Sequence, residues 1–124
     1  MPGYAWIEEE IAVAIYFASQ GVYQRAIPDL LEQRGFSRRL RGVNDKMANI
    51  RKDFPELGSP RHWNAEAVDQ LLDKLSISNS NIYILLKPSE ADQMIVNKYQ
   101  TGLDLAEIYE VRRVLRNMLS YEPA

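Results

Sequence analysis

Residues 35–52, GFSRRLRGVNDKMANIRK, decide the fold that we expect for this chain. Gly35 suits the left-handed conformation that ends a helix, and Ser37 is a residue type that caps the start of the next one. From position 38 to position 52, apolar residues recur at intervals of three and four, which is the pattern of a helix with one buried side. That side consists of Leu40, Val43, Met47 and Ile50.

The opposite side of this expected helix is mostly basic and amide-bearing. Successive side chains are separated by about 100° around an α-helix, which places the apolar and the polar residues on opposite faces. The polar face carries Arg38, Arg41, Asp45, Ala48, Asn49 and Lys52, and its flanks carry Asn44, Lys46 and Arg51. Such a surface suits a polyanion, because each contact with a phosphate releases condensed counterions.

The charge of the chain is concentrated around the same helix. The formal net charge is only −2 over 124 residues, which by itself indicates no partner. Residues 21–52, however, carry eight basic and three acidic residues, a net charge of +5, whereas residues 53–124 carry seven basic and eleven acidic residues, a net charge of −4. The basic segment indicates a site for a polyanion, although it also suits a solvated face packed against the acidic C-terminal part.

Two more helices are expected before the basic one. Residues 6–19 have the periodicity of a helix with one buried stripe, and the three acids at positions 8–10 are expected in solvent, where they complement the helix dipole. Residues 23–34 predict a second helix. Pro28 is compatible with it only if the helix begins near Arg25 or later, because amides of the first turn have no partner to lose.

The second half of the chain also predicts helices. Residues 64–75 are amphipathic, residues 88–99 predict a helix opened by Pro88 and Ser89, and a last helix begins with a capping box at Asp104. The five apolar residues at 82–86 fit a strand or a buried helical turn, and we favour a helix because no second strand is available to pair with them. The last helix is expected to bury Ile108, Val111, Leu115 and Met118.

These patterns predict an all-α protein. Residues 53–62, DFPELGSPRH, contain two prolines and a glycine, which is typical of a linker or long turn. We therefore expect a three-helix domain of the helix-turn-helix kind at residues 1–53, a linker at residues 54–63, and a region of about three helices at residues 64–124 that packs or binds a partner.

Composition argues against several classes of function. The chain has no cysteine and one histidine, His62, so it lacks the residues of thiolate metal sites, cysteine nucleophiles and histidine clusters. No apolar stretch is long enough for a membrane span, and the first residues lack the pattern of a signal peptide, so we expect a soluble intracellular protein. The acids fall at helix starts and on solvent faces, and no glycine-rich phosphate loop is present. We expect neither catalysis, nor a cofactor, a metal or a small-molecule substrate.

Residues 6–52, less than half of the chain, resemble Myb and SANT domains. The opening tryptophan and acidic run, the apolar positions of the second helix, and the third helix are similar to those of the family. The chain departs from the family in having one tryptophan there, Met47 in place of another, Pro28 within the second helix, and Asp45 on the exposed face. The residues that carry the resemblance are Trp6, Glu8, Glu9, Glu10, Ile27, Leu30, Leu31, Arg38, Val43, Asn44, Lys46, Met47 and Arg51.

The resemblance implies binding to double-stranded DNA, with the third helix in the major groove. A nuclear location follows in a eukaryote and a cytoplasmic one otherwise. Asp45 fits this role if it accepts a hydrogen bond from cytosine N4, and Lys46 lies on the flank. The expected phosphate contacts are Arg38, Arg39 and Lys52, with Tyr23 and Arg25 at the start of the second helix, and the expected base contacts are Arg41, Asn44 and Asn49.

A second interpretation is a SANT-type module that binds proteins such as histone tails. An open groove beside residues 8–10 would favour a basic peptide, whereas capped and remote acids there favour DNA. In this interpretation the C-terminal helices form a surface for a partner or for a second copy of the chain. Its residues would be Ile108, Val111, Leu115 and Met118.

Overall fold

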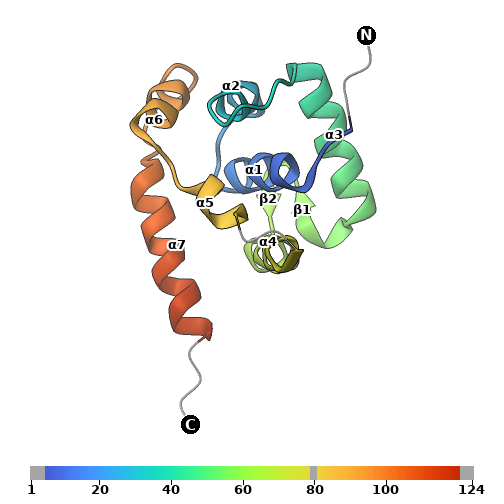
Figure 1. Cartoon of the computed structure of the whole chain (residues 1–124), viewed down its shortest axis with the longest axis vertical. Helices are drawn as coiled ribbons and strands as arrows, with labels where there is room; N and C mark the ends of the chain where they lie inside the picture. The colour runs from blue at the N-terminus through green and yellow to red at the C-terminus, as the bar shows by residue number, and fades with distance from the viewer. Residues whose placement is uncertain (1–4, 79–80, 121–124) are drawn as a thin grey trace.

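The structure, a computed structural model, describes residues 5–78 and 81–120 (Figure 1). Helices dominate this part of the chain, so the expected all-α class is confirmed, and the small two-stranded sheet was not expected. The elements are α1 (Glu8–Ser19), η1 (Gln24–Ala26), α2 (Ile27–Glu32), α3 (Leu40–Asp53), η2 (Pro55–Leu57), β1 (Gly58–Ser59), β2 (His62–Trp63), α4 (Ala65–Ser78), α5 (Ile82–Leu86), α6 (Glu90–Asn97) and α7 (Leu105–Ser120), where η denotes a 3-10 helix.

Helix α1 lies at the centre of the molecule (Figure 1). Every residue from Ala12 to Ala18 is buried, so the expectation of a single buried stripe was wrong. The reason is that α2 and α3 pack against α1 from the first half of the chain while α4 and α5 pack against it from the second. A helix surrounded in this way is apolar on all sides. One buried core therefore continues from α1 through to Leu105.

The turn chemistry before α3 is partly as expected. Helix α2 begins at Ile27, so Pro28 falls in the first turn, where its missing N–H costs no hydrogen bond. Gly35 adopts a φ of 87°, as predicted for the residue after the helix. The expectation that Ser37 caps the next helix was wrong, because α3 begins two residues later than predicted and its N-cap is Arg39.

The segment 54–63 is structured. It contains η2 and the β1–β2 hairpin, in which Gly58 pairs with Trp63 and Ser59 with His62. Gly58 has a φ of 96°, and a Cβ there would collide with the carbonyl oxygen of His62. Leu57 is buried in the core, so the expected linker is part of the packed structure. Division of the chain into two domains at this segment stays a prediction.

The helices of the second half begin as the sequence predicts. Residues 82–86 form helix α5, which confirms the preference for a helix over a strand. Ser89 caps α6, where the Asp92 N–H donates to Ser89 Oγ at 3.1 Å and the Ser89 N–H donates to Asp92 Oδ2 at 2.9 Å. At the start of α7, the N–H of Glu107 donates to Asp104 Oδ1 at 3.1 Å.

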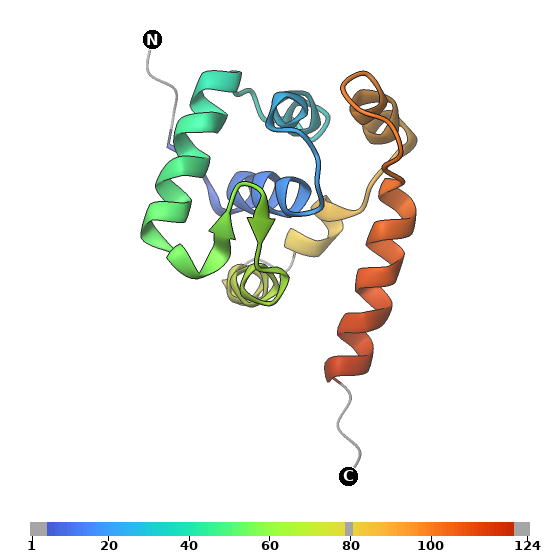
Figure 2. The same ribbon diagram turned by 180° about the vertical axis from the view of Figure 1, so that it is seen from behind.

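Helix α7 runs along the edge of the molecule and extends beyond it (Figure 2). Its inner side carries Leu105 and Tyr109, which pack on the core. The expected buried stripe was wrong, because Val111 and Leu115 are 51% and 50% exposed on the outer side and Ile108 is only half-buried. The side chain of Met118 lies outside the described residues. No described helix combines the length and the apolar character needed to cross a membrane.

Candidate nucleic-acid interface

Helix α3 has one buried side and one open side. Val43, Met47 and Ile50 lie in the core, as the sequence predicts. Leu40 was expected there but is 38% exposed, because it is the first residue of the helix and lies at the end of its contact with the core. The helix forms one edge of the molecule, so the side away from α1 and α2 faces outward (Figure 1).

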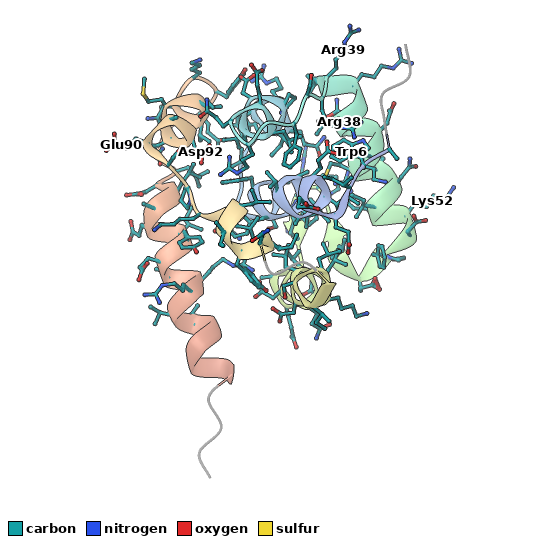
Figure 3. All side chains as sticks on the ribbon, in the orientation of Figure 1. Trp6, Arg38, Arg39, Lys52, Glu90 and Asp92 are labelled. Atoms are coloured by element: carbon teal, nitrogen blue, oxygen red, sulfur yellow. The ribbon has the colours of Figure 1, made fainter. Side chains whose placement is uncertain are left out.

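The outward side of α3 carries the expected basic and amide residues. Arg39 and Lys52 project away from the body at the two ends of the helix (Figure 3). In the described part of the chain, no acid forms an ion pair with Arg39, Arg41 or Lys52. Six of the expected nucleic-acid residues are exposed here, and Lys46 is half-buried. The exposed ones are Arg39, Arg41, Asn44, Asp45, Asn49 and Lys52.

Arg38 does not belong to this surface, so its assignment as a phosphate contact was wrong. Its side chain is 7% exposed and forms an ion pair with Glu10, with 2.6 Å between Nε and Oε2. Nη2 donates to Glu10 Oε1 at 2.9 Å, and the guanidinium lies 4.6 Å from the ring centroid of Trp6 (Figure 3). The physical reason is that Arg38 precedes α3 and turns toward the start of α1.

Glu10 was expected in solvent but is fully buried by this contact. Its Oε1 also accepts the N–H of Ile7 at 3.3 Å, which caps the start of α1. Glu8 is exposed and Glu9 is half-buried. Glu10 therefore caps the helix and is ion-paired with Arg38, so it is not available to a basic peptide.

The start of the second helical segment lies beside α3. Gln24 of η1 donates from Nε2 to Asn44 Oδ1 at 2.6 Å. Tyr23 is 49% exposed, and its N–H donates to Gln100 Oε1 at 2.9 Å. The exposed Arg25 guanidinium lies 6.0 Å from the ring centroid of Tyr23, within the range of a cation–π contact. Tyr23 and Arg25 therefore flank the residue that contacts Asn44, and their role as phosphate contacts stays a prediction.

A buried ion pair that the sequence analysis missed holds the second half of the chain against α2. Arg34 and Asp92 are 58 residues apart, yet Nη1 and Nη2 of Arg34 donate to Oδ1 and Oδ2 of Asp92 at 2.8 and 2.7 Å. Arg34 Nε donates to the carbonyl oxygen of Leu85 at 2.6 Å. The pair positions α6 and α5 next to the turn that leads into α3.

A cavity of about 330 Å³ lies between α1, α4, α5 and α7. Burial raises the pKa of Tyr16 to about 12, and the Arg112 guanidinium, 5.8 Å from its ring centroid, partly opposes this rise. Arg112 pairs with Asp69 at the edge of the cavity. The Tyr16 phenol therefore stays protonated at neutral pH. Within the described residues, no group of three or more histidines and acids could hold a metal ion.

Comparisons with protein-family models, curated proteins and solved structures find no match to this chain. The resemblance to Myb and SANT domains stays a prediction that rests on the residues given above.

Proposed function

We propose that this chain is a DNA-binding or chromatin-associated protein that places α3 in the major groove. The observation that carries the proposal is the outward face of α3, where Arg39, Arg41 and Lys52 have no acidic partner among the described residues. Helix α2, a glycine turn and α3 follow one another as in helix-turn-helix proteins, whose second helix reads the groove.

The exposed residues divide by chemistry into two kinds of contact. Arg39 and Lys52, at the ends of α3, would bind phosphates and fix the register of the helix on the duplex. Arg41 and Asn49 would reach base edges, since arginine pairs with guanine and asparagine with adenine. Asn44 Oδ1 already accepts a hydrogen bond from Gln24, so its second lone pair and the amide N–H would pair with adenine.

The test is a salt series of DNA binding with the wild type and an Arg39→Ala, Arg41→Ala, Lys52→Ala variant. The slope of log K against log salt changes by about 0.9 for each phosphate contact, so the variant, which removes the two expected phosphate contacts Arg39 and Lys52, is expected to lose a slope of about 1.8. Its affinity at low salt should fall accordingly. Arg38 is left unchanged because its removal would disturb the buried contact with Glu10.

A matched control removes three exposed lysines on other elements, Lys74, Lys87 and Lys98. Both variants change the formal net charge from −2 to −5, a loss of three positive charges. Equal effects of the two variants would indicate a long-range charge effect and contradict a specific role of α3. Absence of wild-type binding at low salt would refute the DNA-binding proposal as a whole.

A second candidate function is a SANT-type protein-interaction module, with an assembly surface on α7. The burial of Glu10 against Arg38 argues against a basic peptide at the start of α1. The outer side of α7, however, exposes Val111, Val114 and Leu115 by 44–51% each. Exposed apolar side chains on one side of an amphipathic helix are typical of a surface that pairs with another helix.

The assembly surface predicts a homodimer that depends on Leu115. Sedimentation velocity over a concentration series is expected to show twice the chain mass of 14.3 kDa for the wild type. Leu115→Lys should restore the monomer, because a lysine ammonium in an apolar interface loses its hydration. Ala106→Lys, which adds the same charge at an exposed position of the first turn of α7, should leave the dimer intact. A monomeric wild type at all concentrations would refute this candidate.

A further inference from the structure

A groove of about 410 Å³ lies between α3, the β1–β2 hairpin and the turn that precedes η1. Figure 2 shows the hairpin next to α3 on the side of the molecule that faces the viewer. The groove is lined by Tyr23 from the turn, Gln24 from the start of η1, Arg51 from α3, and Pro60 and Trp63 from the hairpin. It is therefore formed by three separate segments, each of which contributes a polar or aromatic side chain.

Arg51 is the cation of this groove, and no acid among the described residues forms an ion pair with it. Its guanidinium lies 5.5 Å from the ring centroid of Trp63. Nη1 is buried, and no atom of the described residues accepts a hydrogen bond from it. Burial lowers the pKa of Arg51, as expected for a cation that loses hydration without gaining a carboxylate. Buried donors normally have a partner, so an acceptor at this position would satisfy an open requirement of the fold.

The groove borders the surface that we assign to DNA. Arg51 follows Asn44 by seven residues, about two helical turns, so the two side chains lie along one line of α3. Gln24, which lines the groove, also donates to Asn44. Lys52, the next residue, is exposed on the outward face. A duplex with α3 in its major groove would bring one strand of its backbone beside this line.

We propose that the groove binds a phosphate of the DNA backbone, with Arg51 as the residue that pairs with it and the β1–β2 hairpin as the outer wall. The inference rests on the proposed function. A guanidinium presents a planar set of donors that matches two phosphate oxygens, and the Arg51 guanidinium lies over the ring of Trp63 in the hairpin. A small turn of the guanidinium toward the groove would give Nη1 its missing acceptor.

The unpaired charge also has a consequence for the free protein. A guanidinium without a counter-ion in a partly buried position opposes folding, because it loses hydration and gains no ion pair. Arg51→Met keeps a side chain of similar length over Trp63 and removes the charge. This variant is expected to unfold at a temperature equal to or higher than that of the wild type. Replacement of a residue with a structural role would lower that temperature.

Binding to DNA should respond in the opposite direction. Arg51→Met is expected to reduce the slope of log K against log salt by about 0.9, which corresponds to one phosphate contact. Lys87→Met is the matched control, since Lys87 is exposed and belongs to the segment between α5 and α6, two helices that lie away from α3 (Figure 1). A slope for Arg51→Met equal to that of the control would overturn the inference while leaving DNA binding by α3 intact.

A second measurement separates the phosphate site from DNA binding. The chain has two tryptophans, so Trp6→Phe leaves Trp63 as the sole indole reporter of the groove. The fluorescence of Trp63 is expected to change in a saturable way when DNA is added, and also when inorganic phosphate is added at higher concentration. In the Trp6→Phe, Arg51→Met variant, neither DNA nor phosphate is expected to change it. A response to phosphate without one to DNA would refute the proposed function but keep the anion site. A lack of response to both would overturn the inference.

Discussion

Arg34→Met is expected to lower the free energy of unfolding by about 3–5 kcal/mol, the usual cost of removing one partner of a buried ion pair. Asp92 is 1% exposed, and both of its oxygens accept hydrogen bonds from Arg34. Methionine would leave this carboxylate buried without its counter-ion. The carbonyl oxygens of Leu30 and Leu85 would lose their donor as well. Urea unfolding at neutral pH, followed by circular dichroism, measures the change.

A double-mutant cycle with Asp92→Asn separates the pair from the loss of the arginine stem. Asparagine has nearly the shape of aspartate and retains an acceptor for the N–H of Ser89. The double variant is expected to be more stable than the sum of the two single changes predicts, because it leaves no unpaired charge, whereas each single change leaves one. A loss of less than about 1 kcal/mol for Arg34→Met would place the pair among exposed salt bridges and contradict its structural role.

Arg38→Met is expected to lower the free energy of unfolding by a similar amount, about 3–5 kcal/mol. Glu10 is fully buried, and two nitrogens of Arg38 donate to its carboxylate. The guanidinium also donates to the carbonyl oxygen of Ala5 at 3.1 Å and lies against Trp6. These contacts join the chain before α1 to the residue that precedes α3, so their loss should loosen α3 at its first turn.

Arg39→Met is the matched control for this prediction. It changes the same residue type at the adjacent position, but Arg39 is exposed on the outward side of α3. Its stability should change by no more than about 0.5 kcal/mol. The two variants should differ in the opposite way in DNA binding. Arg39→Met is expected to reduce the slope of log K against log salt because it loses a phosphate contact, whereas the folded fraction of Arg38→Met keeps the wild-type slope. A lower salt slope for Arg38→Met with unchanged stability would restore the original assignment of Arg38 as a phosphate contact.

Local sequence patterns were sufficient to predict most helices. The three- and four-residue spacing of Val43, Met47 and Ile50 predicted the buried side of α3, and that side is confirmed. Ser89 capped α6 as predicted, and the start of α2 accommodates Pro28. These features depend on residues within one or two helical turns of one another, which the linear sequence displays directly. The outward position of Arg41 and Lys52 follows from the same spacing.

Contacts between distant parts of the chain decided the rest. The sequence shows a basic residue at position 38, but only the packing of the turn before α3 on the start of α1 brings Arg38 to Glu10. The strands of the hairpin are two residues long, too short for an alternating pattern to reveal them. Likewise, the all-round burial of α1 and the exposed side of α7 depend on which helices pack beside them.

The sequence by itself therefore determined the helices and the composition of each helix face. The tertiary structure decided which faces are covered and which charges are paired. The physical reason is that periodicity records only how side chains are arranged around one axis. Burial and ion pairing, as in Arg34 with Asp92, depend on neighbours from elsewhere in the chain. For α3, this difference separates the buried Arg38 from the exposed Arg39 one residue later.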